Sequence, residues 1–201
     1  MDVVQTKSSI VGERILVREL SVFDAIDIYI NIRDKEVGRW TGPPRQWYLE
    51  NKIGRFVCRA VRHMWKGLQL IWTSIFEPKS KKVFRLAVVL RETGKVIGVV
   101  SLSKNEPQEE FADIGFWISK RYWGKGLMSE ALKLALKFGF EQLGLVSIEA
   151  WAFEKNVSAL KVMEKCGFRL KEVVKDAYIK YNVSQNRLNY AILKSEFERL
   201  E

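Results

Sequence analysis

Residues 116–131 constrain the fold most, because an apolar run passes through two glycines directly into an amphipathic segment. The run 116–118 is typical of a strand end, and Gly124 and Gly126 are typical of a turn before a helix. The first N–H groups of a helix have no intrahelical partner, and the helix dipole places partial positive charge there. A phosphate group can therefore bind at this junction through the backbone, and the glycines let it approach closely.

Two common nucleotide-binding motifs do not fit the glycine turn. A Walker A loop needs a glycine five positions before its Gly-Lys pair and Ser or Thr after the lysine, but Ser119 and Gly126 stand there. A dinucleotide-binding turn needs a third small residue, which would have to be Ser129, and a βαβ unit at this point of the chain. A lone G-x-G is weak evidence for that second motif. The turn therefore indicates a phosphate site of another kind.

Length and composition limit the class of protein further. The 201 residues predict a single domain over 1–201. A net charge of +10 favours an anionic partner, such as coenzyme phosphates, RNA or a ribosome. Cys58 and Cys166 have no CxxC spacing and His63 is the single histidine, so we expect free buried thiols and no metal. We expect a cytoplasmic protein without membrane contact, because no apolar run approaches about 20 residues and the N-terminus has no signal-peptide core.

Hydrophobic periodicity predicts a mixed α/β arrangement with one central sheet. The expected strands cover 14–19, 84–91, 96–102, 111–118, 147–152, 168–174 and 188–193, with a tight hairpin turn at Gly94. The expected helices begin at Ser21, near Trp47, after Gly126 and at Asn156. Strands 111–118 and 147–152 should be parallel, because a crossover helix joins them.

The segment that begins near Trp47 mixes aromatic and basic residues up to Leu68. This composition would suit an RNA or membrane surface, but apolar residues at helical spacing favour a core helix with a solvated basic face. Direct nucleic-acid binding is therefore not expected. Residues 77–82 are expected to form a loop.

Several motifs, in this order and spacing, resemble the GNAT N-acetyltransferases over nearly the whole chain. They are Asp113-Ile114-Gly115-Phe116-Trp117-Ile118, Tyr122-Trp123-Gly124-Lys125-Gly126, Ser129-Glu130-Ala131, and Asn156 followed by Glu164-Lys165-Cys166-Gly167-Phe168. More narrowly, they resemble the RimJ/RimL branch, whose members acetylate N-terminal amines of ribosomal proteins. The resemblance implies a GNAT fold, with antiparallel N-terminal strands and a parallel pair at the acetyl-CoA site, flanked by helices. It also implies direct acetyl transfer to an amine without a covalent enzyme intermediate.

The resemblance also assigns residues to acetyl-CoA. The glycine turn would bind the pyrophosphate, and the strand before it would pair with the pantetheine arm and polarise the thioester carbonyl through a backbone N–H. Lys125 and Lys161 would add positive charge near the phosphates, and Asn156 would both cap its helix and contact the coenzyme. The expected contact residues are Phe116, Trp117, Ile118, Trp123, Gly124, Lys125, Gly126, Leu127, Met128, Ser129, Asn156 and Lys161.

The sequence departs from the family pattern at positions that bear on catalysis. Of the usual Gln/Arg-x-x-Gly-x-Gly/Ala turn only Gly126 is retained, although Trp before Gly-Lys-Gly is familiar in this branch. Met163 stands where many relatives place a general-acid Tyr, and Ala159 where this branch often has Ser, with Ser158 one residue away. The proton for the thiolate would then come from solvent, or from the substrate ammonium through water.

A carboxylate is the obvious group to take the amine proton, because the amine lone pair is the nucleophile. Asp113 falls where several histone-type relatives carry their catalytic Glu, and Glu149 on the next strand is the second candidate. The alternative for both is a solvated or salt-bridged strand residue. Glu130 is expected to be structural, because a carboxylate in the first turn of a helix stabilises the helix dipole.

The expected activity is acetyl-CoA-dependent acetylation of a primary amine, with the N-terminal α-amine of a protein or peptide, of ribosomal-protein type, as the favoured acceptor. Polyamines and aminoglycosides are alternative acceptors, but such polycations usually need an acidic groove. A catalytically inactive acyl-CoA-binding module or a ribosome-bound accessory protein is a further alternative. The acceptor segments carry no motif, and formation of a homodimer is left open.

Overall fold

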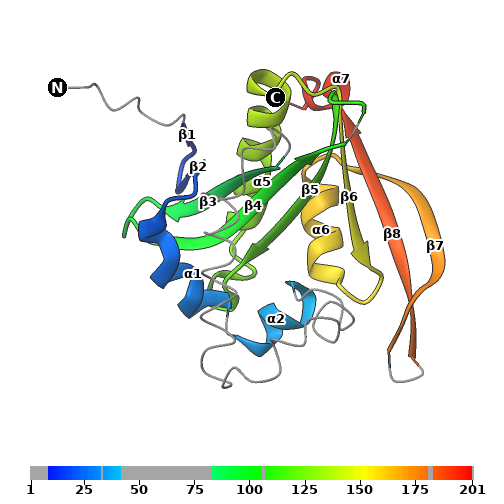
Figure 1. Ribbon diagram of the computed structural model, residues 1–201, viewed down its shortest axis with the longest axis horizontal. Coiled ribbons are helices and arrows are strands. Elements are labelled where there is room, and N and C mark those ends of the chain that lie inside the picture. The colour runs from blue at the N-terminus through cyan, green and yellow to red at the C-terminus, as the bar shows by residue number, and fades with distance from the viewer. Residues whose placement is uncertain (1–8, 33, 42–82, 106, 181–182, 201) are drawn as a thin grey trace.

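The computed structural model describes residues 9–32, 34–41, 83–105, 107–180 and 183–200, which form one eight-stranded mixed sheet (Figure 1). The strand order is β1-β2-β3-β4-β5-β6-β8-β7, and only the pair β5/β6 is parallel. The strands are β1 Ile10–Val11, β2 Ile15–Glu19, β3 Val83–Leu90, β4 Val96–Lys104, β5 Phe111–Ile118, β6 Ser147–Phe153, β7 Arg169–Lys180 and β8 Val183–Leu193. The expected mixed α/β sheet with one parallel pair is therefore confirmed.

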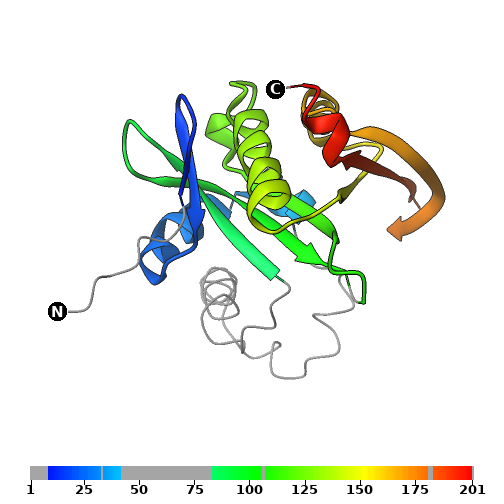
Figure 2. The ribbon, with the colours of Figure 1, turned by 90° about the horizontal axis from the view of Figure 1, so that it is seen from above.

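Helices cover both faces of the sheet. They are the 3₁₀ turns η1 Val22–Asp24 and η3 Lys120–Tyr122, the helices α1 Ala25–Ile32, α2 Lys35–Thr41, α5 Leu127–Lys137, α6 Val157–Lys165 and α7 Lys194–Phe197, and the π-helical turn η4 Phe138–Gln142. In Figure 2, α5 lies over one face of β3 and β4 and α1 lies on the other side. No helix in the described part of the chain is long and apolar enough to cross a membrane.

The alternation of side chains along β3 explains why two layers of helix are needed. Leu86 and Val88 are buried in the core under α5, whereas Ala87 and Val89 belong to a second cluster with Ile28 of α1. Successive residues of a strand point to opposite faces, so an apolar run buried at every position needs cover on both faces.

The first helical segment begins at the predicted residue but is divided. The carboxylate of Asp24 accepts a hydrogen bond from the Ser21 N–H (2.8 Å), and the Ser21 hydroxyl accepts one from Phe23 N–H, which together form a capping box. The chain then forms η1 and α1, and α2 follows as a separate helix that the sequence pattern does not predict. The helix expected between 47 and 68 and the loop expected at 77–82 lie outside the described residues.

The C-terminal hairpin is longer than predicted, and its second strand lies between β6 and β7. The expected strand ends at 174, just before the charged residues Lys175 and Asp176, but pairing continues past a register shift between Val174 and Tyr178. Beyond this point, side-chain hydrogen bonds also stabilise the hairpin. Asp176, at a φ of 51°, donates its N–H to Asn186 Oδ1 (3.2 Å), and Asn186 Nδ2 donates to Glu154 (3.0 Å). Periodicity does not detect a strand held by such contacts.

Candidate active site

The glycine turn joins β5 to α5 with the geometry that the sequence predicts. Gly124 and Gly126 have φ values of +73° and +75°, and Gly126 is the N-cap residue of α5. A Cβ atom at Gly126 would be no closer than 3.6 Å to another group, and a Cβ at Gly124 would meet nothing within 4 Å. Glycine is therefore required by the left-handed backbone and not by crowding.

Three side chains, those of Glu130, Arg14 and Trp123, connect the turn to the sheet. Glu130, in the first turn of α5, accepts hydrogen bonds from the backbone N–H of Arg14 (2.8 Å) and of Ile15 (3.3 Å), and from Arg14 Nε (3.0 Å). Arg14 also donates to the carbonyl oxygen of Lys125 (2.9 Å). Trp123 Nε1 donates to the Ile118 carbonyl oxygen at the end of β5 (2.8 Å). Glu130 thus supports the turn through backbone N–H groups at the start of β2, at Arg14 and Ile15, a contact beyond the dipole effect that the sequence suggests.

The parallel strands β5 and β6 pair over a short distance and then separate (Figure 1). Their ladder joins Phe111 to Ser147, Ala112 to Ile148 and Asp113 to Glu149, and ends there. On its other side β5 stays paired with β4 as far as Ile118. Residues 114–118 therefore have an edge toward β6 that no strand of the described chain occupies. Such an edge can accept an extended ligand through main-chain hydrogen bonds.

A cavity of about 580 Å³ occupies this gap and reaches the glycine turn. It brings together most of the residues expected to contact acetyl-CoA, namely Phe116, Trp117, Ile118, Trp123, Gly124, Gly126, Met128, Ser129, Asn156 and Lys161. An open strand edge, a helix N-terminus and lysine side chains within one cavity fit a ligand with a linear arm and phosphates.

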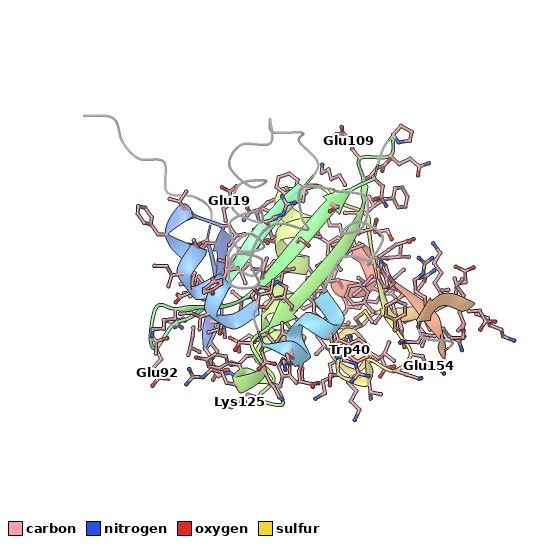
Figure 3. The ribbon with its side chains drawn as sticks, turned by 60° about the horizontal axis from the view of Figure 1, so that its bottom comes forward. Glu19, Trp40, Glu92, Glu109, Lys125 and Glu154 are labelled. Carbon is pink, nitrogen blue, oxygen red and sulfur yellow. The ribbon has the colours of Figure 1, made fainter. Side chains whose placement is uncertain are left out.

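Two of the predicted contact residues do not line the cavity. The Leu127 side chain is buried in the main core, because the first residue of α5 faces the sheet. Lys125 is exposed at the turn, and its Nζ lies 5.7 Å from the centroid of the Tyr122 ring. Trp40 of α2 and Lys125 lie on the same side of the molecule in Figure 3. Leu127 and Lys125 could therefore contribute to phosphate binding only through their backbone groups or through longer-range electrostatic attraction.

Helix α6 supplies one wall of the cavity, and its residue Met163 points into the core instead of the cavity. The side chain of Asn156 caps the helix by accepting a hydrogen bond from Ala159 N–H (3.4 Å), as predicted. Ser158, Lys161, Val162 and Lys165 line the cavity together with Ala159. Met163 is fully buried in the core (0% exposed) and does not line the cavity.

The cavity is also lined by residues that motif analysis missed. They are Trp40 of α2, Arg85 of β3, Ser101 of β4 and the β6 residues Trp151 and Phe153. Their positions carry no motif, since each lies on a different element or inside a strand. Alternation along β6 gives one signal, because Glu149, Trp151 and Phe153 must share a face.

The two candidate bases lie opposite each other in the last residue pair of the β5/β6 ladder. Neither lines the cavity, but Ile114 and Gly115, which directly follow Asp113, do. The Glu149 carboxylate forms an ion pair with Lys171 Nζ (2.6 Å). The pKa of Asp113 is raised because partial burial desolvates the carboxylate and Glu149 is negatively charged, although the positive charge of Arg187 acts in the opposite direction.

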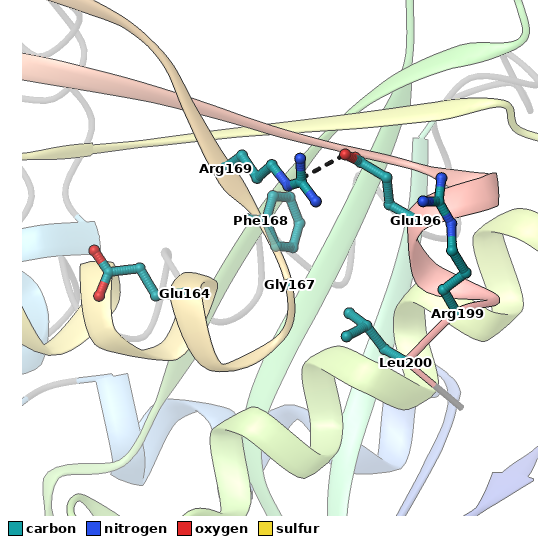
Figure 4. A pocket seen from close by; sticks show the side chains of 7 residues that line it. All are labelled: Glu164, Gly167, Phe168, Arg169, Glu196, Arg199 and Leu200. Carbon is teal, nitrogen blue, oxygen red and sulfur yellow. Dashed lines mark ion pairs between the residues drawn. The ribbon is translucent and has the colours of Figure 1, made fainter.

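A separate hollow of about 320 Å³ lies between α6, the start of β7 and α7 (Figure 4). It is lined by Glu164, Gly167, Phe168, Arg169, Glu196, Arg199 and Leu200, and an ion pair between Arg169 and Glu196 (3.2 Å) lies within it. None of the residues expected to bind the coenzyme lines this hollow.

Comparison with known proteins identifies the family. Residues 14–169 match the family model described as Acetyltransferase (GNAT) domain. The chain belongs to the GNAT family of acetyltransferases, whose members use acetyl-CoA.

The relatives cover this chain to different extents. It is 28% identical over 117 residues to the uncharacterized N-acetyltransferase p20 of Bacillus licheniformis, which covers 56% of this chain and 64% of p20, less than two thirds of that relative. It is 27% identical over 183 residues to the uncharacterized N-acetyltransferase YoaA of Bacillus subtilis, which covers 90% of this chain and 94% of YoaA. A crystal structure of a GNAT-family acetyltransferase from Bacillus anthracis has the same fold, with a TM-score of 0.71, 24% identity, and coverage of 94% of this chain and 100% of that chain.

Relatives with named acceptors differ in what they acetylate. A ribosomal-protein-serine acetyltransferase of Escherichia coli is 26% identical over 150 residues, which cover 64% of this chain and 82% of the relative. A spermidine N(1)-acetyltransferase of the same species is 26% identical over 104 residues, covering 52% of this chain and 56% of the relative. Similarity therefore establishes the acetyltransferase family but does not determine the acceptor or the narrower RimJ/RimL branch.

Proposed function

We propose that the protein acetylates the N-terminal α-amine of a protein or peptide. The observation that carries this choice of acceptor is the charge of the cavity. Among the described residues that line it, the charged ones are Arg85, Lys161 and Lys165, all basic, and no Asp or Glu is present. A polyamine would bring several positive charges into this basic cavity, whereas a peptide N-terminus brings one amine, which must be neutral to react.

The same charges suit the coenzyme. Lys161 and Lys165 of α6 would attract its phosphates, while the N-terminal N–H groups of α5 beyond Gly126 would bind the pyrophosphate. The open edge of β5 at residues 114–118 would pair with the pantetheine arm. A backbone N–H at this edge would stabilise the negative charge that develops on the thioester oxygen during attack.

Direct attack needs a route for one proton. The amine nitrogen forms a bond to the thioester carbonyl carbon, the C–S bond breaks, and the nitrogen loses a proton to the carboxylate of Asp113, directly or through a water. Its raised pKa makes the Asp113 carboxylate a stronger base than an ordinary Asp. Glu149 is the second candidate, but its carboxylate is already paired with Lys171. Solvent supplies the proton to the coenzyme thiolate, since Met163 lies in the core.

The name of the ribosomal-protein-serine acetyltransferase relative supports a ribosomal protein as the natural acceptor class. The expected cytoplasmic location fits such a substrate. Direct contact with nucleic acid is not needed for this reaction.

A direct test uses the purified full chain, acetyl-CoA and three acceptors: peptides starting with Ser or Ala, the same peptides with a blocked N-terminus, and spermidine. We expect coenzyme release only with the free peptides, and mass spectrometry should locate the acetyl group on the α-amine. A clear preference for spermidine would replace this function with the polyamine alternative. Tight coenzyme binding without turnover of any acceptor would favour the inactive accessory module.

A further inference from the structure

Arg187 of β8 lies beside Trp151, which lines the cavity, although Arg187 is not itself a lining residue. It lies opposite Phe153 in the β6/β8 ladder, so both side chains share one face of the sheet. Its guanidinium carbon lies 5.7 Å from the centroid of the Trp151 ring. Trp151 lines the cavity and remains 53% exposed. The Arg187 side chain therefore runs back along β6 from Phe153 toward the paired carboxylates.

The guanidinium of Arg187 has unused hydrogen-bonding capacity. Its Nε is buried and has no hydrogen-bond partner in the described part of the chain. No described carboxylate forms an ion pair with it, although its positive charge acts on Asp113 and opposes the rise in the pKa of that residue. An arginine fixed on an aromatic ring, with N–H donors to spare, is suited to bind a carboxylate.

The positions along β6 set the distance between the two functional groups. Trp151 is two residues beyond Glu149, the partner of Asp113. At a rise of roughly 3.3 Å per residue, the guanidinium over Trp151 lies about 7 Å along the strand from the Asp113 level. An extended peptide advances about 3.3–3.6 Å per residue, so an amine at Asp113 places the second or third side chain near Arg187.

We propose that Arg187, held against Trp151, is a specificity-determining residue that binds an acidic side chain at the second or third position of the acceptor's N-terminal segment. This inference rests on the proposed acetylation of a peptide α-amine. It narrows the acceptor class to N-termini with Asp or Glu close behind the reactive amine.

The test compares peptides that differ only in charge. Each starts with Ser and carries Asp at position two, three or six, with Asn at the same position in the matched partner. For the full-length enzyme we expect Asp at position two or three to lower KM roughly tenfold relative to Asn, the ratio that corresponds to one charged contact. Asp at position six should give a KM close to that of its Asn partner.

Variants assign the preference to Arg187. Arg187→Gln should reduce the Asp/Asn ratio of KM to about one, and Arg187→Lys should leave an intermediate ratio because it keeps the charge and loses the planar donors. Arg169→Gln is the matched control, because it removes the same charge from the far wall of the separate hollow and should keep the full preference. The ratio is the proper readout, since kcat also responds to the effect of Arg187 on Asp113.

Equal KM values for Asp and Asn peptides with the wild-type enzyme would overturn the inference, whatever the variants do. A preference that survives Arg187→Gln, in protein with unchanged circular dichroism, would overturn it as well. If the peptides are acetylated without a charge preference, the proposed function stands and this inference fails. If no peptide is acetylated, both fail.

Discussion

Replacing Gly126 by valine tests whether the backbone geometry of the glycine turn determines the affinity for acetyl-CoA, apart from any effect on the stability of the fold. Gly126 has a φ of +75° and ends the turn as the N-cap of α5. A residue with a Cβ pays about 1–2 kcal/mol in this conformation, and a β-branched side chain fits it worst. The nearest group to a new Cβ is Arg14 Nη2 at 3.6 Å, an ordinary contact, so the strain comes from the backbone.

The turn can relieve this strain only by rotating the peptide groups that start α5. That movement redirects the N–H groups expected to bind pyrophosphate. If the strain of about 1.4 kcal/mol or more is expressed as lost phosphate contacts, the dissociation constant for acetyl-CoA rises at least tenfold. Isothermal titration calorimetry with acetyl-CoA measures this change directly.

Gly94 offers a matched control. It has a φ of +67°, a Cβ added there would meet nothing within 4 Å, and it lies in the β3/β4 hairpin turn outside the cavity. Gly94→Val should lose a similar free energy of unfolding in urea titration and keep wild-type affinity for acetyl-CoA. A folded Gly126→Val protein with unchanged affinity, or an equal loss of affinity in both variants, would refute the assignment of the coenzyme to this turn.

Three further predictions concern carboxylates and the buried thiol. Asp113→Asn should lower kcat by roughly 10²–10⁴-fold with little change in acetyl-CoA affinity. The loss should be smaller at high pH, because more of the acceptor amine is already neutral there. A kcat near that of the wild type at neutral pH, with chemistry rate-limiting, would exclude Asp113 as the base. Burial raises the pKa of the Cys166 thiol from 9.0 to about 12, so its contribution to stability is complete below the unfolded pKa and is lost as pH rises from 9.0 to about 12. The free energy of unfolding of Cys166→Ala should accordingly fall less over this window than that of the wild type, and parallel curves would contradict the prediction. Glu130→Ala should cost about 1–3 kcal/mol in urea unfolding, because it leaves the backbone N–H groups of Arg14 and Ile15 without their acceptor. Glu141→Ala, which removes an exposed i,i+4 pair, should cost less than about 0.5 kcal/mol. Equal costs would show that Glu130 does not support the turn.

The choice between Asp113 and Glu149 as the base depends on the tertiary structure. The sequence places Asp113 and Glu149 on adjacent strands and treats both as candidate bases. The register puts them opposite each other, where partial burial and the charge of Glu149 raise the pKa of Asp113, while the Glu149 carboxylate forms an ion pair with Lys171. The difference in their environments, and hence the preference for Asp113, depends on β7, which lies at the far edge of the sheet.

The residues on the acceptor side of the cavity could not be predicted from the sequence. Trp40, Arg85, Trp151 and Arg187 lie on four elements, and no spacing in the sequence connects them. Only the strand order brings β8 against β6, and only the separation of β5 from β6 turns their faces into cavity walls. Such residues can be identified only from the packing of the elements, because no sequence motif connects them.

The sequence by itself determines the junction of strand, glycine turn and helix, the cap at Asn156, the hairpin at Gly94 and the parallel pair of strands. These features depend on short-range requirements, such as a positive φ, an unpaired helix N-terminus or the reach of a crossover, which a few neighbouring residues satisfy. The tertiary structure decides the point at which β5 and β6 separate, the place of β8 beside β6, and the side chains that face the coenzyme and the acceptor. Those outcomes depend on contacts between segments far apart in the chain, whose free energy exists only when the whole sheet and its helices are packed.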